Sequence, residues 1–288
     1  MRFLTYRENG KDVPAVLTAN GVVSFEKAGI GFDSVLSLVK SGKAQELEGG
    51  LSGLSGVPLD SVELTAPIPY TDGDVICLGI NYTEHAKESA RYEKSAFERD
   101  RDYPVYFSKR VDRAKGSGEA VSLHGDITER VDYEAELAVI IGKDAKNVRR
   151  EDAYSYVFGY TVLNDVSARD IQTRHKQWYF GKSLDGFCCM GPVIVTHGEL
   201  GEPTGLGISS RVNGELRQNS TTSLMVFDIP YVIGELSKGM TLRAGTVISM
   251  GTPAGVGMGF DPPRFIRDGD EVVCEIEKIG KLVNKFVK

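Results

Sequence analysis

Short apolar runs separated by turn dipeptides dominate the chain, a pattern that is more typical of strands than of helices. Near the start, three short β-like runs are broken by Asn-Gly dipeptides at 9–10 and 20–21, which are favoured hairpin turns. A helical pattern over residues 32–39 follows. We therefore expect a small N-terminal β-rich domain over residues 1–70.

Residues 71–288 contain longer apolar runs, and we expect them to form the larger domain. The clearest run is Leu137–Ile141, which is rich in β-branched residues and stopped by Gly142, and a second ends in Asp165. Further strands are predicted at 75–79, 104–110, 247–250, 271–276 and 280–284, a hairpin at 206–216, and helices from Thr83, from Val166 and over 229–237.

Three carboxylates accompany the two clearest strands. Side chains alternate along a strand, so Glu134 and Glu136 should point the same way from the leading end of the run at 137–141. Two neighbouring carboxylates that are removed from water repel each other, so each tends to bind a proton. A hard cation between them removes this repulsion and favours their ionised forms. With Asp165 as a third acid and no His/Cys cluster nearby, the set favours Mg²⁺ or Mn²⁺ over Zn²⁺. The alternative is a solvated strand end with ordinary surface acids.

A histidine and a glutamate share one face of the helix that is predicted from Thr83. His85 and Glu88 are three residues apart, so the carboxylate can orient the imidazole, as in a general base that activates water. The alternative is an exposed helix with a chance pair. Residues 83–103 are dense in charge, a pattern that fits either a mobile lid or a solvated face of the protein.

Two glycine-containing motifs invite nucleotide-binding interpretations that the spacing rejects. Lys176 stands where a phosphate loop ending in Gly181-Lys182-Ser183 needs its first glycine, so we expect Lys182 to supply positive charge to an anionic site. The loop at 251–259 lacks the third glycine of a dinucleotide fingerprint. Its N–H groups and the Thr252 hydroxyl could instead receive a carboxylate, or the loop is a tight structural turn.

Composition narrows the class of protein. The 34 basic and 40 acidic residues of this 288-residue chain give a formal net charge of −6 without a basic tail, which disfavours nucleic acid or an anionic membrane as a partner. The first residues carry no apolar secretory segment, and no apolar run approaches the roughly 20 residues that span a bilayer. Four cysteines without a C-x-x-C pair suit a reducing cytoplasm.

The order of these motifs resembles the fumarylacetoacetate hydrolase family over roughly residues 75–288. The blocks that carry the resemblance are Gly79-x-Asn81-Tyr82-x-x-His85-x-x-Glu88, Asp132-Tyr133-Glu134-x-Glu136-Leu137, Asn164-Asp165-Val166-Ser167-Ala168-Arg169-Asp170, Gly181-Lys182-Ser183-Leu184-Asp185-Gly186-Phe187 and Gly251-Thr252-Pro253-Ala254-Gly255-Val256-Gly257. The chain is most similar to bacterial members with a short N-terminal domain, known as acylpyruvate or fumarylpyruvate hydrolases, 2-hydroxyhepta-2,4-diene-1,7-dioate isomerases and oxaloacetate decarboxylases.

The resemblance implies an α+β fold, a large mixed β-roll with few helices, that forms a homodimer. It places the metal ligands for Mg²⁺ or Mn²⁺ on Glu134, Glu136 and Asp165, the catalytic pair on His85 and Glu88, the substrate-side cation on Lys182, and the pocket wall on Tyr82, Arg169, Gln172 and Thr252. Some relatives have a further metal-binding acid just before the histidine. Residues 78–82 offer none, so we expect three protein ligands plus water.

The charges of these residues indicate an anionic substrate. Three carboxylates and one divalent cation together leave a net charge of about −1. The positive charges of Lys182, Arg169 and Lys109 reverse this sign, so the site suits an anionic 2-oxo acid. We expect C–C bond hydrolysis of a 2,4-dioxo acid of the acylpyruvate or fumarylpyruvate type, with pyruvate leaving as its enolate. The same chemistry serves a 2-hydroxyhepta-2,4-diene-1,7-dioate isomerase or an oxaloacetate decarboxylase or tautomerase. A non-catalytic metal-binding protein is a third, weaker alternative.

Overall fold

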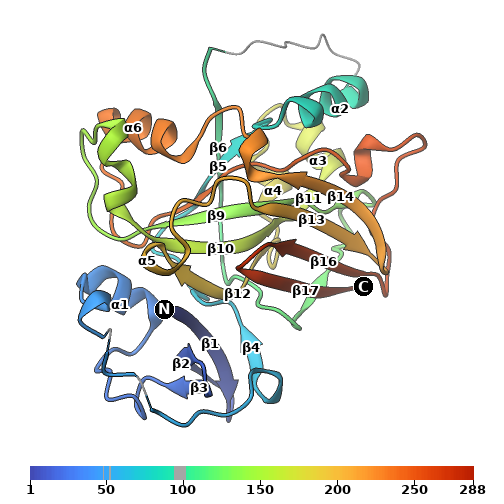
Figure 1. The fold of residues 1–288 in the computed structure, drawn as a ribbon. Coiled ribbons are helices and arrows are strands. Elements are labelled where there is room, and N and C mark those ends of the chain that lie inside the picture. Colours follow the sequence, from blue (N-terminus) through green and yellow to red (C-terminus); the bar gives the residue numbers. More distant parts are fainter. Residues whose placement is uncertain (48, 52, 94–101) are drawn as a thin grey trace.

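The structure is a computed structural model that describes residues 1–47, 49–51, 53–93 and 102–288. In this part of the chain a ten-stranded mixed sheet runs in the order β3-β2-β1-β12-β10-β9-β15-β5-β6, with β4 paired to β1 (Figure 1). Its strands are β1 (Arg2–Glu8), β2 (Lys11–Thr18), β3 (Gly21–Ser24), β4 (Glu63–Thr65), β5 (Val75–Gly79), β6 (Val105–Lys109), β9 (Ala135–Ile141), β10 (Val157–Asp165), β12 (Cys188–Thr196) and β15 (Val247–Ser249).

A second sheet of five strands, in the order β14-β13-β16-β17-β7, packs against the middle of the long sheet. Its strands are β7 (Ala120–Ser122), β13 (Gly207–Val212), β14 (Glu215–Thr221), β16 (Glu271–Ile276) and β17 (Gly280–Val287), and a short pair joins β8 (Val131–Asp132) to β11 (Ser167–Ala168). The helices are α1 (Val35–Ser41), α2 (Thr83–Glu93), α3 (Arg169–Arg174), α4 (Tyr179–Lys182), α5 (His197–Leu200) and α6 (Ile229–Gly239). This arrangement confirms the expected α+β fold with few helices.

Strand β9 shows how the apolar pattern creates this architecture. All seven of its residues are buried, because both faces of the long sheet are covered. Leu137, Val139 and Ile141 face the core that includes the five-stranded sheet, whereas Ala138 and Ile140 face the core that includes α1. Such two-sided burial explains why the run is continuously apolar rather than alternating.

The N-terminal strands continue the long sheet. Arg2 and Phe3 of β1 pair antiparallel with Val195 and Ile194 of β12, so residues of the expected N-terminal domain share hydrogen bonds with the rest of the fold. Figure 1 shows β1, β2, β3 and α1 gathered at one end of the molecule. The division at residue 70 therefore stays a prediction, since the backbone pairing crosses it.

Strand β12, which has no counterpart in the predicted elements, fills the gap between β1 and β10. Its apolar positions are interrupted by Gly191-Pro192, and this interruption hides the strand in the sequence. The predicted hairpin is confirmed, with Asn213 and Gly214 at positive φ between β13 and β14.

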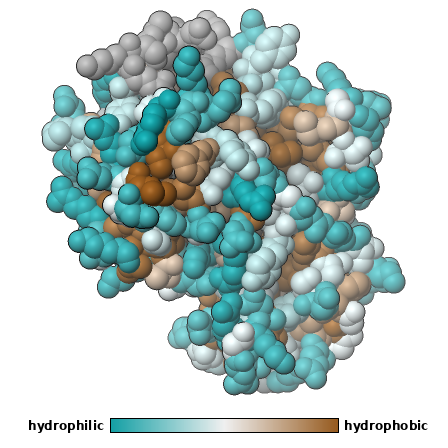
Figure 2. Space-filling view, turned by 180° about the vertical axis from the view of Figure 1, so that it is seen from behind, coloured by the Kyte–Doolittle hydropathy of each residue, from teal (hydrophilic) through white to brown (hydrophobic). Residues whose placement is uncertain are grey.

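Figure 2 shows a largely hydrophilic surface, seen from behind, on which hydrophobic residues gather in a few patches. Within the described ranges, no helix combines the length and the apolar character that a membrane crossing requires.

Candidate active site

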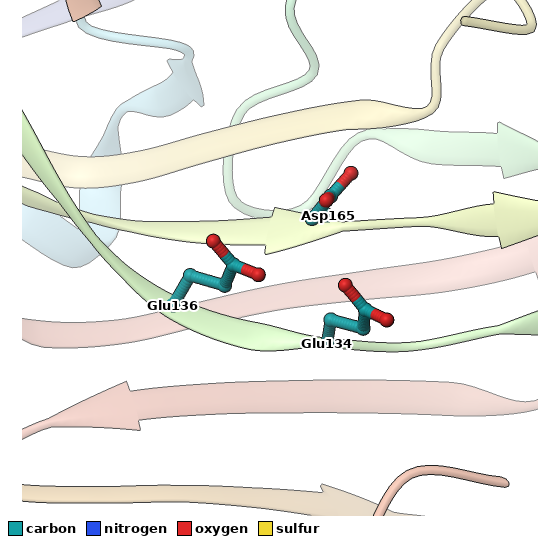
Figure 3. Close-up of side chains that lie close together, drawn as sticks. All are labelled: Glu134, Glu136 and Asp165. Atoms are coloured by element: carbon teal, nitrogen blue, oxygen red, sulfur yellow. The ribbon is translucent and has the colours of Figure 1, made fainter. Parts of the chain in front are cut away.

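Three carboxylates meet at the point where β9 begins and β10 ends. Oxygen atoms of Glu134, Glu136 and Asp165 all lie within 4.8 Å of one another. Figure 3 shows the two glutamates on the same side of one chain segment, with Asp165 on the neighbouring strand. The register brings them together, because Leu163 pairs with Glu136 and the Asp165 N–H donates to the Glu134 carbonyl over 2.9 Å.

Buried cations neutralise two of these carboxylates. The Lys182 ammonium lies 2.6 Å from Glu134 Oε2 and 2.7 Å from Asp165 Oδ2, and Arg169 Nη2 lies 2.6 Å from Glu134 Oε1. Burial alone would raise the pKa of Glu134, but Lys182 and then Arg169 outweigh it and lower that pKa well below its usual range. Burial would likewise lower the pKa of Lys182, but Asp165 and Glu134 raise it above its ordinary value. Glu134 is therefore ionised and Lys182 protonated.

The third carboxylate has no such partner. Glu136 Oε2 accepts hydrogen bonds from Ser249 Oγ at 2.5 Å and from the Gly251 N–H at 2.9 Å, and within the described residues it forms no ion pair. Burial, then the charges of Asp165 and Glu134, raise the pKa of Glu136 well above its usual value. A cation bound between these groups would oppose that effect and favour the ionised form.

The residues present fit a hard divalent cation. If Glu136 is ionised, as a bound cation would favour, the buried charged groups of the cluster are four carboxylates and three cations, an excess of one negative charge: Asp132, Glu134, Glu136 and Asp165 against Lys109, Arg169 and Lys182. Among the predicted site residues, the Tyr82 hydroxyl and Asp165 Oδ1 are buried oxygens without a hydrogen bond in the described structure, and Asp165 Oδ1 is in ionic contact with Lys109. An all-oxygen donor set with spare negative charge suits Mg²⁺ or Mn²⁺.

The predicted catalytic pair stands on α2, beside the three carboxylates. His85 is 5% exposed, and its Nδ1 lies 3.4 Å from Glu88 Oε2, at the outer limit of a hydrogen bond. Glu88 is itself held by the Gly255 N–H at 2.9 and 3.1 Å from its two oxygens. The start of the helix is anchored by Asn81, whose amide donates to the Met250 carbonyl over 2.8 Å. The imidazole therefore has a fixed location.

The glycine-rich loop does receive carboxylates, but they belong to the chain itself. Besides the contacts to Glu88 and Glu136, the N–H groups of Gly257 and Met258 donate to Asp132 at 2.7 and 3.0 Å. Gly255 is required because its φ is +105° and a Cβ there would lie 2.0 Å from the Arg217 carbonyl oxygen.

The Thr252 hydroxyl also serves the protein. It donates to the Ala135 carbonyl over 2.9 Å and accepts from Gln218 at 2.7 Å. In this structure its proton is committed to the backbone, and the expected contact of this hydroxyl with a carboxylate stays a prediction. Thr252 still lines the cleft through its side chain.

Asp132 is a site residue that the sequence analysis left without a role. It is fully buried and accepts from the two loop N–H groups, and from Arg169 Nε at 2.9 Å. It thereby joins the glycine-rich loop to the arginine that holds Glu134. The sequence signal for its role was its position at the start of the Asp-Tyr-Glu motif. Its hydrogen-bond donors, however, come from segments that are distant in the chain.

We expect Asp132→Asn to destabilise the protein by about 3–5 kcal/mol, as removal of one partner of a buried ion pair does. An amide would face Arg169 and two N–H donors with only one accepting oxygen. Asp170→Asn is the matched control, since Asp170 is only half-buried and bonded to Thr128. Denaturant unfolding of both variants measures the difference, and equal stabilities would contradict this role of Asp132.

Most of the predicted site residues line one narrow cleft. Its wall consists of Leu78, Gly79, Ile80, His85, Ser89, Phe107, Glu134, Glu136, Arg169, Gln172, Trp178, Lys182, Thr252 and Met258. Gln172 lies beside Arg169, whose Nη1 donates to the Gln172 side-chain oxygen over 3.0 Å. Asp165 and Glu88 stand just behind the wall, and Tyr82 is 2% exposed and outside the set of lining residues.

Lys109 is not among the residues that line the cleft, and the predicted contact with substrate stays a prediction. Its ammonium lies 2.9 Å from Asp165 Oδ1, outside hydrogen-bond geometry, and donates to the carbonyls of Val166 and Lys182. It is fully buried behind Asp165. Its charge supports the carboxylate cluster from the protein side.

Two aromatic residues that the sequence analysis did not select close one side of the cleft. The rings of Phe107 and Trp178 are in edge-to-face contact at 5.2 Å, and the Lys182 ammonium lies 5.1 Å from the Phe107 ring centre. Gly79 permits this packing, because a Cβ there would lie 2.2 Å from the Trp178 ring. The wall beside the cations is therefore apolar and rigid.

The predicted lid at 83–103 is described in part. Over 83–93 it is helix α2, which is tied to the glycine-rich loop through Glu88 and through Arg91, a donor to the Gly259 carbonyl. Residues 94–101, where the charge density is highest, lie outside the described residues. Whether the segment closes over the cleft stays a prediction.

The α+β fold and the acid-lined cleft together define an enzyme of the fumarylacetoacetate hydrolase family. Residues 74–287 match the C-terminal domain of fumarylacetoacetate (FAA) hydrolases, so the chain belongs to this family and the predicted resemblance is confirmed.

Similar proteins include an enzyme of Bacillus subtilis (strain 168), the oxaloacetate tautomerase YisK. It is 49% identical over 228 residues, which cover 79% of this chain and 74% of that protein. A solved fumarylacetoacetate hydrolase from Exiguobacterium antarcticum is 38% identical with a TM-score of 0.81, covering 100% of this chain and 99% of its own. A fumarylpyruvate hydrolase from Pseudomonas aeruginosa, solved with Mn²⁺ and pyruvate, is 29% identical with a TM-score of 0.66, covering 74% of this chain and 89% of its own.

Proposed function

We propose that the protein is a divalent-metal-dependent oxaloacetate tautomerase, which interconverts the keto and enol forms of this small 2-oxo acid. The proposal departs from our first expectation of C–C hydrolysis and takes up its alternative. It is supported by the similarity to YisK and by the cleft, in which one histidine lies beside the ion-paired side chains of Glu134 and Lys182. Because the same cleft would also serve the related reactions, the similarity to an oxaloacetate tautomerase is the observation that carries the choice among them.

In this proposal Glu134, Glu136 and Asp165 hold Mg²⁺ or Mn²⁺. A divalent cation bound there would polarise the 2-oxo group and stabilise the negative charge of the enolate. With this ion the buried cluster carries one net positive charge instead of one negative charge. A small dianion such as oxaloacetate is then attracted to the cleft.

Tautomerisation needs one proton removed from C3 and one delivered to the oxygen on C2. Lys182, held protonated by Asp165 and Glu134, donates a hydrogen bond to a developing oxyanion but is a poor base. Imidazole is the side chain whose ordinary titration lies nearest neutrality, so we assign proton transfer to His85. Arg169 and Gln172 line the same cleft and bind the substrate's carboxylate.

C–C hydrolysis of an acylpyruvate or fumarylpyruvate is the second candidate, because the His85–Glu88 pair can also activate water. The relative solved with Mn²⁺ and pyruvate is a fumarylpyruvate hydrolase, which supports keeping this candidate. Isomerisation of 2-hydroxyhepta-2,4-diene-1,7-dioate and decarboxylation of oxaloacetate would use the same groups. None of these needs a different arrangement of the three carboxylates.

The test is a side-by-side assay of the purified protein with Mg²⁺ or Mn²⁺. We expect the loss of enol-oxaloacetate absorbance to be accelerated, without matching release of pyruvate. Cleavage of acetylpyruvate to pyruvate and acetate, measured in parallel, should be much slower. Rapid cleavage with no acceleration of the enol–keto exchange would overturn the proposal in favour of the hydrolase.

We expect the segment 83–103 to become more protected from amide hydrogen exchange when oxalate, a stable 2-oxo acid analogue, is added with Mg²⁺. Closure would remove the backbone from water and exclude solvent from the cleft. The segment at 229–239, α6, serves as an internal reference. Equal protection of 83–103 with and without oxalate would argue for a simple solvated face.

We further propose a homodimer in the cytoplasm whose partner molecules are small anionic 2-oxo acids, not nucleic acids or membranes. The dimer rests on the family resemblance, and the remaining expectations rest on composition. Size-exclusion chromatography with light scattering gives the oligomeric state, and a monomer at micromolar concentration would contradict the dimer.

A further inference from the structure

A second cavity lies where the N-terminal strands and α1 meet the rest of the fold. Its volume is about 320 Å³, and it shares no lining residue with the cleft described above. Its wall includes Met1, Lys143, Tyr154, Tyr156, Phe158 and His197. Figure 1 shows the N-terminus, α1 and α5 side by side at this place. Small-molecule sites favour such junctions and have volumes of roughly 300–1,000 Å³.

One wall of the cavity is aromatic. Tyr154, Tyr156 and Phe158 follow one another with single-residue spacing where η3 (Arg150–Tyr156) leads into β10, and all three are half-buried. The Tyr154 ring is stacked on His197, with ring centres 5.4 Å apart and planes within 7°. This wall offers flat apolar surfaces against which another planar group can pack.

The hydrogen-bond pattern fixes the tautomer of His197. Its Nδ1 lies 2.9 Å from the hydroxyl of Tyr160, which is fully buried. If Nδ1 carried the proton, the buried phenol hydrogen would have no acceptor within the described structure, so the phenol donates to Nδ1. Nε2 therefore carries the hydrogen, and among the described residues no acceptor pairs with it.

The cavity also contains a cation without a counter-ion. The Lys143 ammonium lies 4.3 Å from the centre of the Tyr156 ring and makes no ion pair within the described ranges. The acids next to Lys143 and His197 in the chain are paired elsewhere: Asp144 lies 3.1 Å from Arg243, and Glu199 is occupied by the N-terminal ammonium at 2.8 Å and by Arg2 at 2.7 Å. The free donors of the cavity are therefore an ammonium and an imidazole N–H, and both favour an anion.

We propose that this cavity is a second ligand site, which binds an aromatic monocarboxylate. The carboxylate would accept from Lys143 and from His197 Nε2, and the ring would pack along the aromatic wall. Oxaloacetate suits the site poorly, because it has no apolar body to cover these rings. The inference does not depend on the proposed tautomerase activity.

Benzoate is the probe, and isothermal titration calorimetry on the full-length protein is the measurement. We expect saturable binding that is absent for benzamide, which has the same ring without the charge. Lys143→Glu should weaken benzoate binding about tenfold or more, the equivalent of about one charge-assisted contact. Lys146→Glu, a nearby exposed lysine outside the lining residues, makes the same charge change and should leave binding unaltered.

Two further variants keep the test decisive. Glu136→Gln alters the other cleft, so benzoate affinity should be unchanged in it, and a loss there would place the probe in the active site. Tyr160→Phe frees His197 Nδ1 and should weaken binding without removing it. Absence of saturable benzoate binding, or equal affinity in wild type and Lys143→Glu, would overturn the proposal.

Discussion

Two isosteric substitutions in the same acidic cluster, Glu134→Gln and Glu136→Gln, should change the stability of the metal-free protein differently. Glu134 pairs with Lys182 and Arg169 at 2.6 Å, so its loss leaves two buried cations without that charge and should cost about 3–5 kcal/mol. Glu136 has no cation partner within the described residues and faces two like charges. Its amide analogue still accepts from Ser249 and Gly251, so the metal-free variant should be at least as stable as wild type.

With metal the two variants should behave alike. Wild-type protein should gain stability from an ion that binds only the folded state, by about 2.7 kcal/mol at 100 times the dissociation constant. Both variants should lose this gain and lose turnover, because each lacks one ligand. Thermal unfolding in EDTA and in Mg²⁺ or Mn²⁺ measures both effects. Full turnover after chelation, or an unchanged metal-dependent shift in Glu136→Gln, would rule out the metal site.

His85→Ala should reduce kcat/KM for oxaloacetate tautomerisation by about 10²–10⁴-fold, the usual contribution of a general acid–base group. Two other charged groups of the cleft are committed, since Lys182 is held protonated and Glu134 is held ionised by its ion pairs. The loss should therefore appear in kcat with little change in thermal stability. Stopped-flow measurement of the enol signal, with Mg²⁺ present, gives both kinetic constants.

Two neighbouring substitutions on α2 serve as controls. Ser89→Ala removes a hydroxyl that lines the same cleft one turn beyond His85, and it should change kcat only a few-fold. Glu88→Gln keeps an acceptor for the Gly255 N–H but removes the charge beside the imidazole. Its effect on kcat should therefore lie between those of Ser89→Ala and His85→Ala. If His85→Ala resembles Ser89→Ala, proton transfer belongs to another group and the assignment fails.

The sequence predicted local features of the site well, because they depend on short-range periodicity. The run at 137–141 and the alternation of Glu134 and Glu136 are visible in the chain, and β9 and Figure 3 confirm them. The helix that carries His85 begins at Thr83, as its pattern indicated. In each case the type of element and the face on which a side chain lies follow from residue spacings of two to four.

Long-range partners were beyond such reasoning. The glycine-rich loop was expected to bind a carboxylate. The carboxylates that it binds belong to Glu88 on α2 and Asp132 on β8, and only the tertiary fold brings these two elements beside the loop. Lys109 was placed in the pocket by its charge, whereas the register of β6 puts it behind Asp165. Asp132 was passed over because its donors are more than 30 residues away in the chain.

The scattered origin of the cleft has a consequence for how the chain folds. Its residues come from the segments near 85, 134, 169, 182 and 252, so no local piece of the chain can assemble it. Closing contacts of such large sequence separation is slow and requires the sheets to pair first. A metal held by Glu134, Glu136 and Asp165 would bind only molecules that have completed this step, and its release would be an early sign that the sheets are separating. Metal content would thus report the fraction of natively folded chains in a preparation, before any loss of secondary structure is detectable.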